Sequence, residues 1–519
     1  MFGNPRGPLP EFGPACLLPL LLACAPAVPQ EVGVTGDGNL QAVLEEIRAE
    51  AELPALAGML IVGDEIVEIA ATGVRTLGDP TPVTMDDKWH IGSNTKAMTA
   101  TLAGIFVERG LIEWSTTIED VFPELRGQIR SEFLDVRLDE LLSHTAGVSN
   151  NFFETPFWAT SRETEAPLKE QREVWVPQLL SLEPGASRGA FAYSNSGYVV
   201  AGAMLERLTG ESWERLMQRE IFQPLGMNGA GFGPPGDPEA AADQPRGHQG
   251  QGNSARPVYA DNPPALGPAG TVHVSLPQHA HFLIAHMKGA QGEDGIVTAA
   301  TFKKLHTPFP ESNYAQGWGV AEREWARGST LTHNGSNTMW FHTVWVAPER
   351  DIAIAAATNI AGENAPGAVD RAVGAILDRF QASESSGEPP PEDPESEDGG
   401  PEGTSVWEHA KLSGVDFRGT GNEPGWFIEI RDDLEARDGK RILFVFDYGQ
   451  QEAILHTSDS EPEPGLRRTV YRGENGDLQI VVEIEGNPCL DTMSGEQFES
   501  TVTVEFQGRT YRGCGRALQ

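Results

Sequence analysis

Alternating and continuous apolar runs mark two pairs of strands at opposite ends of one long segment. Residues 56–73 (LAGMLIVGDEIVEIAATG) read as two strands that turn at Gly63 and Asp64. Residues 340–359 read as two more strands, joined at Pro348-Glu349-Arg350-Asp351. The pattern therefore predicts strands near the beginning and the end of this segment.

Helical patterns fill the space between and after these strands. Residues 93–109 are apolar on every side of a helix from Ala97 to Val107, which predicts a buried helix. Residues 197–208 and 365–380 also read as helices. Outer strands with helices between them predict an antiparallel sheet flanked by helices.

A change of composition divides the chain. Residues 382–405 (ASESSGEPPPEDPESEDGGPEGTS) contain no lysine, arginine or large apolar side chain, which predicts an extended linker. A large domain is expected over 39–381 and a small one over 406–519. The small domain contains short strand patterns separated by Gly, Asn and Asp, so it is expected to be all-β.

The N-terminus is typical of an export leader. Its apolar stretch from Cys16 to Cys24 is too short to span a bilayer but suits a signal region. Leu21-Leu22-Ala23-Cys24 resembles a bacterial lipobox, which makes residues 1–24 the leader and Cys24 the lipidated residue. Ordinary cleavage after Ala25 or Ala27 is the alternative. We expect an exported bacterial protein, periplasmic or lipid-anchored, whose contact with membrane is limited to that anchor.

The net charge of the chain limits the classes of binding partner that we expect. The chain has 38 basic and 75 acidic residues, a formal net charge of −37. Such a surface repels nucleic acid and anionic membranes, so no nucleic-acid partner is expected. The ordinary interpretation is a solvated acidic surface, and the alternative is a cationic substrate or partner.

Cysteines and histidines give no sign of a metal. Outside the leader only Cys489 and Cys514 remain, and one pair in an exported chain predicts one disulfide. His279, His281 and His286 lack the i, i+4 spacing of a helical zinc site, so they are expected at the surface or in packing. Neither metal nor cofactor is expected.

The chemistry-bearing residues begin with Ser93-Asn94-Thr95-Lys96 at the start of the buried helix. Positions i and i+3 share a face, so the Lys96 amine can approach the Ser93 hydroxyl. A lysine activates serine if burial and the helix N-terminus lower its pKa. The structural alternative is an N-cap serine beside a solvated lysine.

Two further segments contain candidate catalytic or substrate-binding residues. Tyr193-Ser194-Asn195 precedes the helix at 197–208, where a phenol near Lys96 can relay a proton and Asn195 can bind a substrate amide. The alternative is that Asn195 or Ser196 caps that helix. The second of these segments is His333-Asn334-Gly335-Ser336. Its Gly335 would admit a substrate backbone, and the Ser336 N–H would complete an oxyanion hole with the N–H of Ser93.

The alternative for His333-Asn334-Gly335-Ser336 is a hairpin turn at Asn-Gly.

Together, the three segments resemble the serine β-lactamase-like family, with Ser-x-x-Lys, Tyr-x-Asn and Lys/His-x-Gly in this order. The family includes class C β-lactamases, D-alanyl-D-alanine carboxypeptidases and related esterases. Further resemblances are LLSHTAG at 141–147, PLGM at 224–227 and QGWG at 316–319.

The resemblance covers roughly residues 40 to 380 and implies a sheet with helices on both faces plus an all-helical region. It implies that Ser93 is acylated, that Lys96 is its proton partner, and that Tyr193 is the general base and acid. It further implies that Asn195 binds substrate and that His333 orients it.

The third segment has His333 where class C β-lactamases typically have lysine. Histidine is mostly neutral at pH 7, which favours esters or short D-amino-acid peptides over β-lactams as substrates. A β-lactamase of the same mechanism is the first alternative. A non-catalytic envelope binder or sensor is the alternative from another class.

The C-terminal segment resembles a small bacterial envelope domain, through GTGNEPGW at 419–426, Cys489 with DTMSG at 491–495, and YRGCG at 511–515. This resemblance implies no chemistry. A stabilising accessory barrel or sandwich is expected, and carbohydrate or envelope binding is the alternative.

Overall fold

The computed structural model describes residues 40–386, apart from 241 and 311, and residues 415–518, apart from 423–424, 433–439, 447–450, 458–459, 464–466, 476–477, 488 and 491–496. The expected leader, with Cys24, lies outside these residues, as does most of the expected linker. In the described part, no helix combines the length and the apolar character that crossing a bilayer requires.

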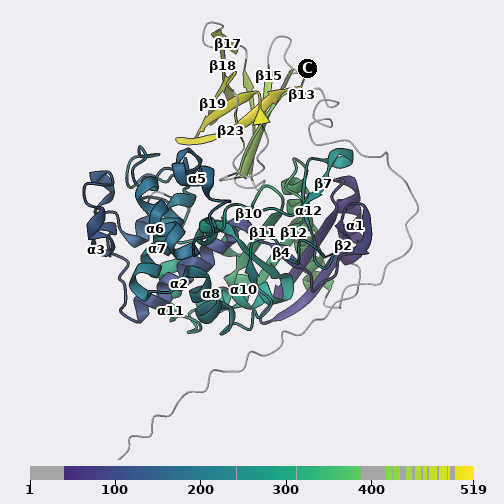
Figure 1. Cartoon of the computed structure of the whole chain (residues 1–519). Coiled ribbons are helices and arrows are strands. Elements are labelled where there is room, and N and C mark those ends of the chain that lie inside the picture. Colours follow the sequence, from purple (N-terminus) through teal and green to yellow (C-terminus); the bar gives the residue numbers. More distant parts are fainter. Residues whose placement is uncertain are drawn as a thin grey trace, which may run out of the picture.

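An antiparallel sheet of seven strands, in the order β3-β2-β1-β12-β11-β10-β9, is the frame of the large domain (Figure 1). Its strands are β1 Ala55–Val62, β2 Glu65–Thr76, β3 Asp79–Pro82, β9 Gly319–Arg323, β10 Gly328–Ser336, β11 Phe341–Ala347 and β12 Ile352–Thr358. Both strand pairs predicted from the sequence are present. Because β1 pairs with β12, the two ends of the domain meet in the middle of the sheet.

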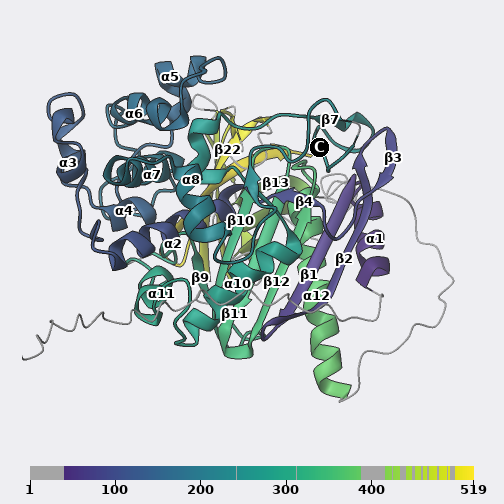
Figure 2. The ribbon, with the colours of Figure 1, turned by 60° about the horizontal axis from the view of Figure 1, so that its bottom comes forward.

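Alternation along β1 divides the core into two layers. Leu56 and Leu60 pack with α1 (Leu40–Glu50) and α12 (Ala365–Ser386) on one face. Met59 and Ile61 face the larger core with α2 (Thr95–Glu108) and α10 (Leu276–Ala290). Figure 2 shows α10 and α12 on opposite sides of the sheet. The expected sheet with helices on both faces is therefore confirmed.

A helical region lies beside the sheet and completes the large domain (Figure 2). Its main helices are α3 Ile118–Val121, α4 Leu138–Leu142, α5 Pro156–Thr160, α6 Leu168–Leu179, α7 Asn195–Thr209, α8 Trp213–Met217 and α11 Ala299–His306. Shorter elements link the two parts: α9 Gly267–Gly270, the sheet of β4 Lys88–His90, β5 Gly231–Phe232 and β8 Val272–Ser275, and the pair β6 Gly247–Gln249 and β7 Arg256–Val258.

The helix α2 lies at the centre of this domain. All its residues from Thr95 to Phe106 are buried, as the apolar pattern predicts. Ser93 precedes it in a single 3₁₀ turn, Gly92–Asn94.

The C-terminal domain is all-β, as predicted. Its strands are β13 Val415–Asn422, β14 Gly425–Asp432, β15 Lys440–Phe446, β16 Gln451–Thr457, β17 Ser460–Glu463, β18 Arg468–Asn475, β19 Leu478–Glu485, β20 Cys489–Leu490, β21 Gln497–Phe498, β22 Ser500–Phe506 and β23 Arg509–Ala517. A bridge between His456 and Glu474 joins β16 to β18 and closes the sheet into a barrel. Cys489 and Cys514 form the expected disulfide.

One expected boundary is wrong. The helix α12 continues to Ser386, so the first residues of the predicted linker, from 382, are helical. Ala382, Ser383 and Glu384 are compatible with a helix, and the Ser383 hydroxyl donates to the Phe380 carbonyl at 2.7 Å. The breaking residues, Gly387 and the prolines after it, come later.

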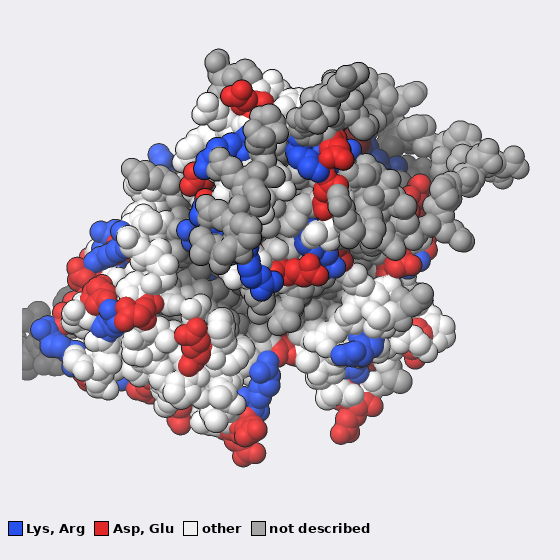
Figure 3. Space-filling view, turned by 90° about the horizontal axis from the view of Figure 1, so that it is seen from above, with Lys and Arg blue, Asp and Glu red and all other residues white. Residues whose placement is uncertain are grey.

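Charge is mixed on the face seen in Figure 3, where basic and acidic side chains of the described residues are interspersed.

Candidate active site

The core of the candidate site is the buried amine of Lys96. Its side chain is fully buried on the first turn of α2. Three acceptors surround Nζ: Ser93 Oγ at 2.9 Å, Asn195 Oδ1 at 2.8 Å and the Ala269 carbonyl at 2.7 Å. An ammonium group has three N–H donors, so this arrangement satisfies all of them.

Tyr193 lies over the same amine. Lys96 Nζ is 4.7 Å from the centroid of its ring, within the range of a cation–π contact. A cation at this distance favours the phenolate form of a tyrosine. The geometry thus brings a serine hydroxyl, a lysine and a tyrosine into one cluster from two distant segments.

Asn195 is the first residue of α7, and both its side chain and its backbone N–H make hydrogen bonds. Its Oδ1 accepts from Lys96, and its backbone N–H donates to Asn150 Oδ1 at 2.7 Å. The cap of α7 is Ser194, whose hydroxyl accepts from the N–H of Gly197 at 3.1 Å. The capping alternative for Asn195 or Ser196 is therefore wrong, and the Asn195 side chain is used in the cluster.

His333 lies on β10 and is buried. Its Nδ1 contacts the Asn334 carbonyl, which only accepts, so Nδ1 carries the proton. In the neutral ring Nε2 is then an acceptor, and the Tyr314 hydroxyl, 2.9 Å away, donates to it. Burial, followed by the charge of Lys96, lowers the pKa of His333 to about 3, so the ring is neutral at pH 7 as expected.

The segment around Gly335 is strand, not a hairpin turn. Asn334, Gly335 and Ser336 pair in register with Thr343, His342 and Phe341 of β11. The turn alternative for Asn-Gly is therefore wrong.

Gly335 is needed for a different reason from the one expected. A Cβ atom there would lie 2.0 Å from the Ile91 carbonyl oxygen and 2.8 Å from the Ser93 nitrogen. Likewise, a Cβ at Gly92 would lie 2.3 Å from the Ser336 nitrogen. The space that the side chain would fill is occupied by the protein's own backbone, not left for substrate. These two glycines bring the backbone nitrogens of Ser93 and Ser336 onto neighbouring segments.

His144 is a member of the cluster to which the sequence assigned no role. Its ring is 4.2 Å from that of Tyr193 and 4.7 Å from that of Tyr314, and its Nδ1 accepts from the Ser194 N–H at 3.1 Å. Burial, then the charges of Lys96 and His333, lowers the pKa of His144 well below its usual value. It is a neutral support for the Tyr193 ring.

Tyr314 and Ala269 were also missed. Tyr314 sits in a loop before Gln316-Gly317-Trp318-Gly319, and Ala269 acts through its carbonyl oxygen. The resemblance at 316–319 marked the right loop but not the tyrosine, and a main-chain acceptor leaves no signal in side-chain identity.

The histidines of α10 lie where the sequence predicts, in packing or near the surface. His279 and His286 are buried and His281 is half-buried, so two of them belong to packing. Within the described residues no three His, Cys, Asp or Glu side chains gather as metal ligands would.

Comparison with known proteins agrees with this geometry. The Beta-lactamase family model matches residues 40–378, and the chain therefore belongs to the β-lactamase family. It is 25% identical over 331 residues to penicillin-binding protein 4 of Amycolatopsis lactamdurans, covering 61% of this chain and 83% of that protein. It is 31% identical over 183 residues to the lovastatin esterase of Penicillium rubens, covering 32% of this chain and 45% of the esterase.

A solved structure shares the fold over nearly the whole chain. The octameric penicillin-binding protein homologue from Pyrococcus abyssi aligns with a TM-score of 0.56 and 19% identity, over 92% of this chain and 99% of that one. The protein is accordingly an enzyme, a hydrolase of the serine β-lactamase superfamily.

Proposed function

We propose that the protein hydrolyses small esters or short D-amino-acid peptides through an acyl-enzyme on Ser93. The observation that carries this proposal is the 2.9 Å hydrogen bond from the buried Lys96 amine to the Ser93 hydroxyl. A serine is a weak nucleophile until a neighbouring group takes its proton. Few purely structural roles require a fully buried lysine bonded to a serine one turn away.

In this mechanism Lys96 stays close to the hydroxyl as its proton partner, and Tyr193 acts as general base and acid. Three acceptors around Nζ favour the ammonium form, and its charge next to the ring stabilises a phenolate. The backbone N–H groups of Ser93 and Ser336 would hold the oxyanion. Asn195 and His333 would orient the substrate.

The proposed preference for esters or short D-amino-acid peptides over β-lactams rests on His333. A β-lactam has a carboxylate beside the reacting carbonyl, and a neutral imidazole offers it no full charge. The pKa of about 3 keeps this ring uncharged at neutral pH.

The test is intact-mass analysis after reaction with a fluorophosphonate and, separately, with a fluorescent penicillin. A single adduct is expected with the fluorophosphonate on the wild type and on Ser115→Ala, an exposed control serine. No adduct is expected on Ser93→Ala. An adduct on Ser93→Ala contradicts the nucleophile. A penicillin adduct on Ser93, together with faster hydrolysis of the penicillin than of an ester, would support the β-lactamase alternative. A folded wild type that forms no adduct with either reagent would support the non-catalytic alternative.

Localisation is a separate part of the proposal. The disulfide of Cys489 with Cys514 supports an oxidising compartment such as the periplasm. Labelling of thiols in the protein isolated from its source without reductant should find neither cysteine free. Mass analysis of the mature N-terminus would distinguish a lipidated Cys24 from cleavage after Ala25 or Ala27.

A further inference from the structure

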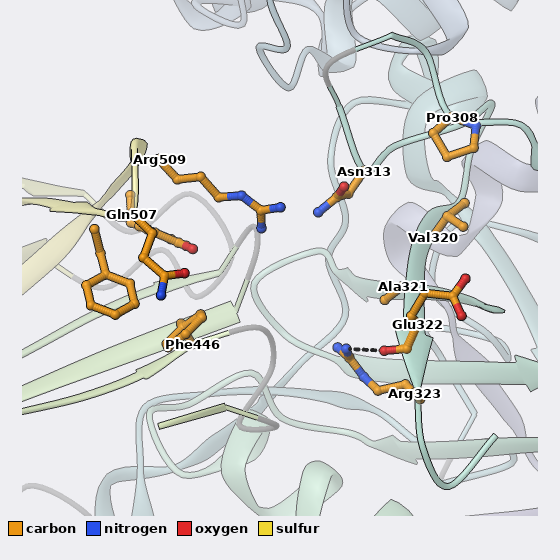
Figure 4. Close-up of a pocket in the computed structure, with 11 residues that line it drawn as sticks. Pro308, Asn313, Val320, Ala321, Glu322, Arg323, Phe446, Gln507 and Arg509 are labelled. Atoms are coloured by element: carbon orange, nitrogen blue, oxygen red, sulfur yellow. Dashed lines mark hydrogen bonds between the residues drawn. The ribbon is translucent and has the colours of Figure 1, made fainter. Parts of the chain in front are cut away.

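A cavity of about 560 Å³ lies between the two domains. One wall is the edge strand β9 with the loop before it, and the other is the β22–β23 hairpin with the end of β15 (Figure 4). It is lined by Pro308, Asn313, Val320, Ala321, Glu322 and Arg323 of the large domain and by Phe446, Phe506, Gln507, Arg509 and Tyr511 of the barrel. Neither domain makes this cavity alone.

The cavity wall is linked to the catalytic cluster through one loop. Asn313 faces the cavity, and the next residue, Tyr314, bonds to His333. The loop is held closed because the Val320 N–H donates to the Asn313 carbonyl at 2.7 Å and Tyr314 is bridged to Gly319. A molecule in the cavity would therefore contact the loop whose next residue, Tyr314, bonds to His333.

The cavity is amphipathic. On the barrel side Phe446, Phe506 and Tyr511 form an aromatic cluster, with ring centroids 5.3 Å and 6.2 Å from Phe446. On the opposite side Val320 and Pro308 add aliphatic surface. This composition suits an aryl or alkyl body.

Arg509 supplies a positive charge to this cavity. Its guanidinium extends from the hairpin toward Asn313, while the Glu322 carboxylate points away from the hairpin (Figure 4). Among the described residues no carboxylate pairs with Arg509, although the chain has a net charge of −37. Guanidinium groups bind carboxylates by two parallel hydrogen bonds.

The backbone holds Arg509 in a fixed place. It pairs with Phe506 across the hairpin, so the turn consists of Gln507 and Gly508 alone. Both turn residues have positive φ, +49° and +76°, as a tight type I′ turn requires. The start of the arginine side chain is therefore rigid.

We propose that this cavity is a substrate subsite that binds the carboxylate end of an amphipathic acid, with the carboxylate on Arg509 and the apolar body against Phe446 and Val320. The barrel would then select among substrates that Ser93 attacks. The role in catalysis rests on the proposed function, whereas binding of the acid does not.

Binding is tested first with 4-phenylbutyrate and the full-length Ser93→Ala protein by titration calorimetry. Adding Arg509→Gln should raise the dissociation constant about tenfold or more, because a charge-assisted hydrogen bond is lost. Arg512→Gln is the matched control, because Arg512 is an exposed arginine of the same strand outside the cavity, and it should leave binding unchanged. Equal affinity in the Arg509→Gln and Arg512→Gln proteins, or no binding at all, overturns the proposal.

Selection is tested next on the active enzyme with 4-nitrophenyl glutarate hemiester and the neutral 4-nitrophenyl valerate. Arg509→Gln should raise KM for the hemiester about tenfold and leave valerate unchanged. An equal change for both esters would overturn the subsite. If the wild type cleaves neither ester, the proposed function fails, while the calorimetry still decides whether the cavity binds acids.

Discussion

The Tyr314 hydroxyl donates a hydrogen bond of 2.9 Å to Nε2 of His333, and this contact joins the loop beside the interdomain cavity to the strand beside Ser93. It fixes the histidine as a neutral acceptor whose other nitrogen is held by its own strand. The orientation of His333 therefore depends on a residue that lies outside all three sequence motifs.

Tyr314→Phe should lower kcat/KM for a p-nitrophenyl ester about tenfold without unfolding the protein. The variant leaves a buried imidazole nitrogen without its donor, which costs about 1–3 kcal/mol and loosens the ring. Tyr259→Phe is the control, since Tyr259 is 39% exposed and bonds to loop carbonyls. Equal activity of the Tyr314→Phe enzyme and the wild type would contradict the positioning role.

His333→Lys should raise kcat/KM for a chromogenic cephalosporin about tenfold relative to that for p-nitrophenyl butyrate. A charge-assisted hydrogen bond contributes about 1.5–3 kcal/mol, against 0.5–1.5 for a neutral one. Burial and Lys96 disfavour a cation here, so the gain should appear only for a substrate that brings a carboxylate. His333→Gln is neutral and should give no such gain. An unchanged ratio in His333→Lys would show that another group already binds the carboxylate.

Gly335→Ala should reduce ester hydrolysis by 100-fold or more. The added methyl group meets backbone atoms of Ile91 and Ser93, so the nucleophile must move, and a displacement of about 1 Å costs roughly 100-fold. Gly367→Ala is the control, because nothing lies within 4 Å of a Cβ there and α12 gains a better helix former. Steady-state kinetics and the Tm of both variants separate a local displacement from unfolding. Full activity in Gly335→Ala would show that the close approach is not needed.

Stability should fall in acid because buried histidines must take up protons on unfolding. Burial lowers the pKa of His279 to about 3 from its ordinary 6.5. Between these values the unfolded chain binds more protons than the native one, so the contribution is present above pH 6.5 and is lost as the pH falls toward 3. His279→Leu should reduce the pH slope of the unfolding free energy by up to about 1.4 kcal/mol per pH unit between pH 4 and 6.

The measurement is urea unfolding at several pH values, with Phe282→Leu as a neighbouring substitution that removes no titratable group. Phe282 stacks with His279 at 6.3 Å between ring centroids and is equally buried. Identical slopes in His279→Leu and the wild type would mean that this ring is protonated in the native state.

The sequence predicted those parts of the site that short motifs encode. Ser93 and Lys96 are one helical turn apart, so their contact follows from helix geometry, and Tyr193 and Asn195 flank the start of another helix. Tyr314 and the carbonyl of Ala269 could not be predicted, because loop closure and main-chain direction decide where they lie. The pattern marks Gly335 as a point of close approach, but the group that approaches it is the protein's own backbone, which sequence does not show because it does not reveal that β10 crosses the turn before α2.

The fold was predictable where the apolar pattern was long, as in β1, β12 and α2. The barrel was expected only as a class, because its strands are short and their order depends on pairings far apart. Phe417 of β13, for example, pairs with Ala517 near the end of the chain. The end of α12 was placed too early because Ser and Glu residues suit a linker and a helix alike.

The pairing of β1 with β12 has a consequence for how the molecule is made. Leu56 pairs with Thr358, about 300 residues later, so the centre of the sheet is a contact of very long range. Closing so long a loop slows folding, and a chain emerging from the ribosome cannot begin to close the sheet at its centre until β12 has been synthesised. Ser93 and Lys96 are synthesised about 250 residues before β12, yet the sheet beside them is completed only with the last strands of the domain.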